Sequence, residues 1–99
     1  MSAKKLTDNA ITMTKDMLVA NKLGIHARPA AMFVKTANRF SCDIFVEKDG
    51  EKVNGKSIMG IMMLAASKGS TVQLTVDGTD EAEAMQVIGD LIGNGFGEE

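Results

Sequence analysis

The chain has 99 residues, which is enough for one domain with a modest core, because roughly 60–65% of the unfolded surface is buried at this length. A net charge of −2 and a pI of about 5.3 provide no positive field for nucleic acid or an anionic membrane surface. One cysteine excludes an internal disulfide, and one cysteine with one distant histidine excludes a zinc site. We therefore expect a globular protein without metal, cofactor or nucleic-acid partner.

Two features of the chain bear on its location. No apolar run reaches the ~18–20 residues that a membrane span requires, and the opening MSAKKLTDNA lacks the apolar segment of a secretory signal. The single cysteine fits a reducing compartment. These observations predict a cytoplasmic protein without membrane insertion, in which residues 1–10 are a mobile extension and residues 11–99 form the domain.

The first half of the domain predicts a strand, a helix and a hairpin. Residues 11–19 alternate as in a half-buried strand, with Lys15 interrupting an apolar face made of Ile11, Met13, Met17 and Val19. After Gly24 the period becomes helical and predicts a helix over residues 27–39 with a buried stripe of Ala30, Phe33, Val34 and Ala37. Residues 42–54 alternate again around Asp49-Gly50, a two-residue turn that favours a hairpin.

The second half predicts a short helix, a strand and a final helix. Ser57 is a suitable N-cap for a short helix that ends before Gly69 and has an apolar array of Ile58, Ile61, Met62 and Ala65. Residues 71–77 alternate as a strand with Val72, Leu74 and Val76 on one face. Asp80 is expected to cap the last helix, with Glu83 in the reciprocal capping position and Gly93 near the end. Its apolar stripe consists of Ala84, Met85, Ile88, Leu91 and Ile92.

The resulting order is β-α-β-β-α-β-α. Helices with a single apolar stripe must cover one face of a sheet, and alternating strands leave the other face in water. The pattern predicts one domain with a layer of helices on a layer of strands.

The stretch LGIHARPAA places the only histidine of the chain at the start of the first helix. Pro29 is accepted in a first helical turn, because its missing N–H would have had no intrahelical partner. The amides of Ala27 and Arg28 are then free at the positive end of the helix dipole, and Arg28 adds a guanidinium suited to phosphate. Imidazole is both a nucleophile and a leaving group toward phosphorus. The segment therefore favours a site that carries a phosphoryl group on His26.

A simpler interpretation is equally consistent with the spacing alone. His26 can serve only as a helix cap, and Arg28 can be only a solvated side chain, because each feature is weak by itself. No second acid or base lies near His26 in the sequence, which disfavours hydrolytic chemistry. From the residues alone, both interpretations stay open.

Two motifs, LGIHARPAA and VNGKSIMGIMMLAASKG, together resemble those of the HPr family. This family comprises the histidine-containing phosphocarriers of the phosphoenolpyruvate-dependent phosphotransferase system. The resemblance extends from about Ile11 to the C-terminus without an evident insertion. It implies an α+β fold, an HPr-like open-faced β-sandwich, in which a four-stranded antiparallel sheet of order 1-4-2-3 is covered on one face by three helices.

The resemblance also assigns His26, Arg28 and Pro29 of the first motif to positions of the family motif. His26 would be phosphorylated on Nδ1 by enzyme I, with phosphoenolpyruvate as the source, and would pass the group to enzyme IIA proteins. Arg28 matches the phosphate-pairing arginine of the family, and Pro29 matches the proline of the motif. The protein would be a carrier intermediate and not a stand-alone enzyme.

Ser57 matches the regulatory serine of the family, which the ATP-dependent HPr kinase/phosphorylase phosphorylates in organisms that have that enzyme. A helix cap worth about 1 kcal/mol is the simpler role, and both roles can hold. A phosphate here would add a charge of about −2 near partner surfaces. The alternative function is therefore a Ser57-phosphorylated signalling adaptor that binds a transcription regulator or another target.

The apolar residues of the second motif divide into two groups. By the resemblance, Ile58, Met59 and Met62 match a partner-docking patch, whereas Ile61 and Leu64 are assigned to the core. Without the resemblance, a Met/Ile stripe at helical spacing would more often be core, although unbranched Met adapts to several partners.

One residue departs from the family pattern. Leu23 occupies the position where many members carry Ser or Asn beside the phosphohistidine, so that side-chain contact is absent here.

The NKLG lead-in and the GNGFGEE tail are similar to proteobacterial-type members, which include nitrogen-branch paralogues that serve regulation. The resemblance therefore supports phosphocarrying more strongly than sugar uptake.

Overall fold

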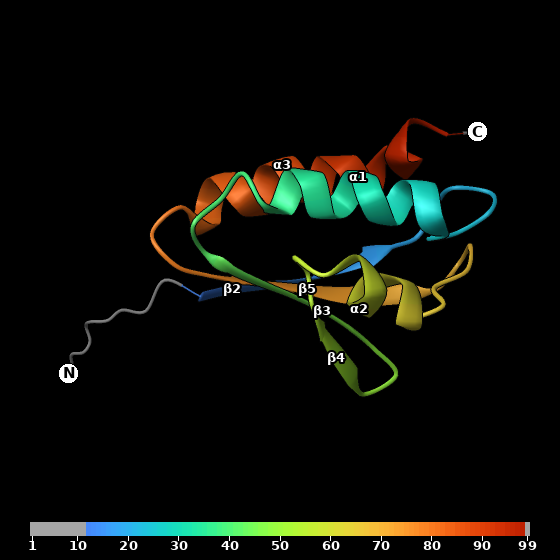
Figure 1. The fold of residues 1–99 in the computed structure, drawn as a ribbon, viewed down its shortest axis with the longest axis horizontal. Helices are drawn as coiled ribbons and strands as arrows, with labels where there is room; N and C mark the ends of the chain where they lie inside the picture. Colours follow the sequence, from blue (N-terminus) through green and yellow to red (C-terminus); the bar gives the residue numbers. More distant parts are fainter. Residues whose placement is uncertain (1–11, 99) are drawn as a thin grey trace.

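Four strands form one antiparallel sheet in the computed structural model, which describes residues 12–98 (Figure 1). The sheet order is β2-β5-β3-β4, which is 1-4-2-3 when the strands are numbered along the chain, and it confirms the expected topology. The strands are β2 (Thr12–Leu18), β3 (Asp43–Lys48), β4 (Glu51–Asn54) and β5 (Thr71–Asp77). The expected extension over residues 1–10, together with Ile11, lies outside the described residues.

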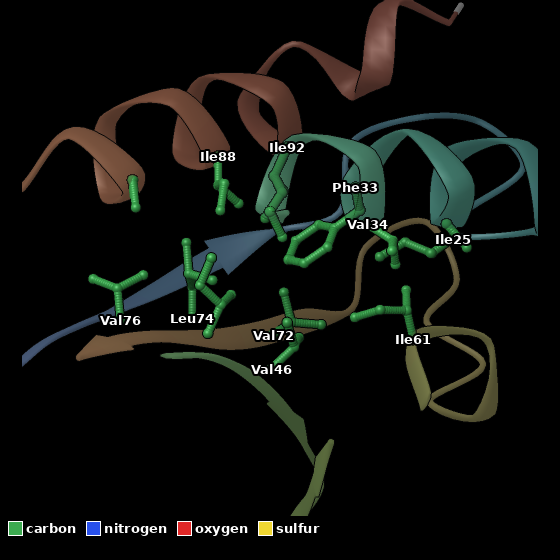
Figure 2. Packing of buried hydrophobic residues seen from close by; sticks show 14 of the residues in the cluster. Ile25, Phe33, Val34, Val46, Ile61, Val72, Leu74, Val76, Ile88 and Ile92 are labelled. Carbon is green, nitrogen blue, oxygen red and sulfur yellow. The ribbon is translucent and has the colours of Figure 1, made fainter. Parts of the chain in front are cut away.

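Helices α1 (Ala27–Ala37) and α3 (Glu81–Gly93) lie beside one another over one face of this sheet (Figure 1). The short helix α2 (Ile58–Met63) packs against α1 and β4. Figure 2 shows the shared core, in which side chains of the helices point toward β5. Its fully buried members include Ile88 and Ile92 of α3 and, from β5, Val72, Leu74 and Val76. The other face of β5 exposes Thr71, Gln73 and Asp77, so the expected division into a covered face and a wet face is confirmed.

Helix α1 ends two residues earlier than the sequence pattern predicts. After Ala37 the chain tightens, because Arg39 N–H donates to Thr36 O at 3.1 Å and Phe40 N–H donates to Ala37 O at 3.2 Å. These turns, with 3₁₀-type hydrogen bonds, bring Phe40 into the core, where it is 6% exposed. The predicted stripe of α1 is otherwise confirmed, since its buried residues are Pro29, Ala30, Phe33, Val34 and Ala37.

The predicted hairpin is confirmed. Lys48 of β3 pairs with Glu51 of β4, which leaves Asp49 and Gly50 as a two-residue turn. Both turn residues have left-handed backbone angles, with φ of 53° at Asp49 and 84° at Gly50. An Asp-Gly pair accepts these angles readily, and this explains why the dipeptide identified the turn.

The predicted capping box of α3 is wrong. The Asp80 side chain forms no cap hydrogen bond. Its carboxylate turns instead to the loop before β3, where it accepts hydrogen bonds from Ser41 N–H at 2.8 Å and Cys42 N–H at 2.9 Å. The expected end of α3 at Gly93 is confirmed, with Asn94 as C-cap.

Ala65 does not belong to the apolar array predicted for the short helix. Helix α2 ends at Met63, and Ala65 is exposed with a left-handed φ of 49°. The chain turns at this point to bring Ala66 into the core, where it is 2% exposed.

A groove of about 300 Å³ lies between β2 and α3, and none of the predicted site residues lines it. Lys15 lines this groove, so the residue that interrupts the apolar pattern of β2 shares the helix side of the strand with its neighbours. The groove is lined by Met13, Lys15, Met17, Ala82, Met85, Gln86, Gly89 and Asp90.

Over residues 12–98, none of the helices combines the length and the apolar character needed to traverse a lipid bilayer.

Candidate functional site

His26 is the N-cap residue of α1, but its side chain does not cap the helix. Its backbone is extended, with φ of −99° and ψ of −165°, and its carbonyl oxygen accepts the first intrahelical hydrogen bond from Ala30 N–H at 2.9 Å. The imidazole forms no cap hydrogen bond, and 40% of the side chain is exposed. The structure therefore disfavours the simpler interpretation of His26 as a cap and leaves its ring accessible.

The loop before His26 is held against the segment that follows α2. Ile25 N–H donates to Ala66 O at 2.8 Å, and Ile25 is buried. Gly24 is needed here, because its φ is 70° and a Cβ atom at this position would lie 2.5 Å from the same carbonyl oxygen. These contacts fix where the chain enters α1 and hence where the imidazole stands.

The first turn of α1 offers unpaired donors beside the imidazole. Ala30 is the first residue whose N–H donates within the helix, and Pro29 has no N–H. Ala27 and Arg28 are both exposed, and their backbone N–H groups donate to no acceptor among residues 12–98. The Arg28 guanidinium forms no ion pair within the same residues. Two amides, a guanidinium and the positive end of the helix dipole are thus available to one anion.

Glu98 also lies at the site, and the sequence analysis missed it. Its Oε2 lies 3.3 Å and its Oε1 3.4 Å from His26 Nε2. This corrects the expectation that no second acid or base stands near the histidine. The two residues are 72 positions apart, so spacing along the chain could not reveal the contact.

One signal for this contact was present in the sequence. Gly95 and Gly97 flank Phe96, and glycines at this spacing allow a chain to turn back on itself. In the structure the short helix η1 (Gly95–Gly97) forms such a turn after α3. The start of α1 and η1 consequently lie at the same end of the molecule (Figure 1).

Ser57 is the N-cap of α2, as predicted. Its Oγ accepts a hydrogen bond from Gly60 N–H at 3.1 Å, and its side chain is partly exposed.

The apolar residues of α2 divide as the sequence analysis expected. Ile61 and Leu64 are buried, at 1% and 4% exposure. Figure 2 shows Ile61 pointing into the core near Val34 and Ile25. We call the exposed set the α2 patch; it consists of Ile58, Met59, Met62 and Met63, and only Met63 was absent from the prediction. Leu23, on the loop before His26, is exposed as well, at 73%.

The fold and this site define a small α+β protein in which a partly exposed histidine stands beside two unpaired helix amides. Residues 13–94 match the family model described as the PTS HPr component phosphorylation site. The chain therefore belongs to the HPr family, whose phosphocarrier proteins are not stand-alone catalysts.

The individual relatives agree with the family. The chain is 54% identical over 80 residues to phosphocarrier protein HPr of Neisseria meningitidis serogroup A, covering 81% of this chain and 90% of the relative. It is 57% identical over 74 residues to HPr-like protein Crh of Halalkalibacterium halodurans, covering 75% and 88%. Its structure resembles crystalline HPr-C-His from Thermoanaerobacter tengcongensis, with a TM-score of 0.84, 54% identity and coverage of 88% and 98%. The resemblance to HPr, including its proteobacterial members, is thereby confirmed.

Proposed function

We propose that this protein accepts a phosphoryl group on His26 from phosphorylated enzyme I and passes it to enzyme IIA proteins of the phosphotransferase system. The observation that carries the proposal is the half-exposed imidazole at the N-cap of α1, which makes no capping bond. A ring that is used neither in the core nor as a cap is free to react with a partner.

The chemistry follows from the groups around the ring. A lone pair of His26 attacks phosphorus, the bond from phosphorus to the donor group of enzyme I breaks, and a new P–N bond forms. The Ala27 and Arg28 amides and the Arg28 guanidinium are suited to donate to the phosphoryl oxygens, whose charge the helix dipole also favours. Transfer to enzyme IIA repeats the exchange with His26 as the leaving group.

The α2 patch is suited to contact both partners. Met59 is 74% exposed and Ile58 46%, so the short helix presents apolar area beside α1, against which it packs. Unbranched Met side chains adapt to different partner surfaces, as a carrier that meets enzyme I and several enzyme IIA proteins requires. The proposal places this exchange in the cytoplasm, with residues 11–99 as the working domain.

The first test is phosphorylation by enzyme I with phosphoenolpyruvate. We expect one acid-labile phosphate per chain of the wild type, transferable to enzyme IIA, and none in His26→Ala. Lys35→Ala, an exposed change on the same helix, is the matched control and should be phosphorylated normally. A His26→Ala protein that still takes the phosphate, or a wild type that takes none, would contradict the proposal.

A second candidate function is a signalling adaptor controlled by phosphorylation of Ser57, and the 50% identity to Crh, described as the Bacillus subtilis catabolite repression HPr, favours it. An HPr kinase/phosphorylase would modify the Ser57 hydroxyl, which is partly exposed and directly precedes the α2 patch. The added charge of about −2 would change which partners bind there, including a transcription regulator. A nitrogen-branch role would use the same site for regulation instead of sugar uptake.

Ser57→Asn separates this candidate from a purely structural role of the serine. Asn is as good an N-cap as Ser, so the variant should keep α2 intact while it lacks the hydroxyl. We expect an ATP-dependent, acid-stable phosphate on the wild type only, with target binding lost in the variant. If the organism's own kinase leaves the wild type unlabelled, the adaptor function is rejected.

A further inference from the structure

We infer that Glu98 is a positioning residue for His26, because it holds the Nε2 proton and so leaves the lone pair on Nδ1. The inference rests on the proposed function of His26 as a phosphoryl carrier. It adds a role for the C-terminal end of the described chain, to which the sequence analysis assigned none.

The contact joins a partly exposed ring to a more buried carboxylate. Both Glu98 oxygens lie within 3.4 Å of His26 Nε2, and the Glu98 side chain is only 18% exposed. Within residues 12–98, no other carboxylate contacts the imidazole. A carboxylate is an acceptor only, so a neutral His26 satisfies it when the ring proton is on Nε2.

Asn21 fixes the carboxylate in this place. It is 1% exposed, and its Nδ2 donates to Glu98 Oε1 at 3.0 Å and to Gly24 O at 2.6 Å. Both neighbours are acceptors, so the NH₂ group of the amide must face them. One buried side chain thus ties the C-terminal segment to the loop that positions the histidine.

The backbone after α3 is shaped to deliver Glu98. Gly95, Phe96 and Gly97 have successive left-handed φ angles of 61°, 58° and 74°. Phe96 is 2% exposed and anchors the turn in the core, while a Cβ at Gly95 would lie 3.3 Å from Asn21 Cβ. A left-handed Phe is energetically unfavourable and persists only where the surroundings determine it. The turn therefore has a defined geometry that brings the carboxylate to the ring.

The proton that Glu98 holds matters in both directions of transfer. During attack, Nδ1 supplies the electron pair to phosphorus while Nε2 keeps its hydrogen, so the product is a phosphorylated imidazolium. During onward transfer, the P–Nδ1 bond breaks and the ring leaves as neutral imidazole, a much better leaving group than the imidazolate that loss of the Nε2 proton would require. Glu98 contacts Nε2 and not Nδ1, so Nδ1 stays available to phosphorus.

Glu98→Ala in the full chain tests the inference, with Glu83→Ala as the matched control. Glu83 is exposed near the start of α3, and its loss changes the net charge by the same amount. The first readout is the pair of ring ¹⁵N chemical shifts of unphosphorylated His26, which report the tautomer without any partner protein. The second is the rate of phosphoryl acceptance from phosphorylated enzyme I, and thermal unfolding serves as a check on the fold.

We expect Glu98→Ala to move the ¹⁵N shifts toward those of a free imidazole with mixed tautomers and to slow acceptance roughly tenfold, as the loss of one hydrogen bond to a charged group predicts. Glu83→Ala should change neither. The inference would be overturned if Glu98→Ala left the ¹⁵N shifts unchanged, or if it changed the shifts but not the rate of phosphoryl acceptance. The carrier function would still stand in either case, provided that the wild type accepts the phosphoryl group and His26→Ala does not. If even the wild type accepted no phosphoryl group, the proposed function would fail. The role of Glu98 in phosphoryl transfer would then fail as well.

Discussion

The Asp80 carboxylate connects two parts of the chain that are far apart in sequence. It accepts hydrogen bonds from the backbone N–H groups of Ser41 and Cys42, in the loop between α1 and β3. The bond from Ser41 N–H is the main cause that lowers the pKa of Asp80 below 3.8. Burial, with Asp80 as a neighbour, raises the pKa of the Cys42 thiol to about 11, so this cysteine stays an unreactive thiol at neutral pH.

We predict that Asp80→Asn lowers the midpoint of urea unfolding at neutral pH. An amide offers one acceptor oxygen in place of two, so one of the two backbone N–H groups loses its partner. Because folding lowers the pKa of Asp80, its stabilisation is full above the unfolded-state value and is lost as the pH falls through the folded-state value. The difference between wild type and variant should therefore shrink at strongly acidic pH. Glu83→Gln is the control, and equal midpoints of wild type and Asp80→Asn at neutral pH would refute the prediction.

At the scale of elements, the sequence predicts those structures whose cause is local. The Asp49-Gly50 turn, the stripe of α1 and the alternation of β5 each depend on neighbouring residues, and all three are confirmed. The predictions failed where a distant group competes. The Asp80 carboxylate accepts the backbone N–H groups of residues 41–42 and not those of its own helix. Helix α1 ends early because Phe40 is buried in the core.

The candidate site shows the same division. The location of His26 at the start of α1 was readable from Pro29 and the change of period, and the structure places the ring there. Its contact with Glu98, 72 positions away, depends on the buried side chain of Asn21 and on the left-handed turn at residues 95–97. No periodicity along the chain encodes such a contact, because it arises only when the two ends of the fold meet.

At the scale of the whole molecule, the core and the surface proposed for partners consist of different residues. Ile88 of α3 is completely buried and points into the core shared with β5 (Figure 2), whereas Met59 of the α2 patch is 74% exposed. A carrier that meets several partners benefits from this separation, since its exposed apolar residues can serve binding while the core alone sustains the fold. The two sets should therefore respond differently to truncation.

We predict that Ile88→Ala costs about 3 kcal/mol of unfolding free energy, because it removes one buried methylene and two buried methyl groups and leaves a cavity. For a chain of this length that loss lowers the melting temperature by about 15 °C. Met59→Ala, which also truncates a large apolar side chain, should change stability by no more than about 0.5 kcal/mol, because that side chain is already in water. It should instead weaken binding to enzyme I. Calorimetry of both variants measures stability, and titration with enzyme I measures binding. Comparable losses of stability in the two variants would show that Met59 supports the fold and does not form part of a free docking surface.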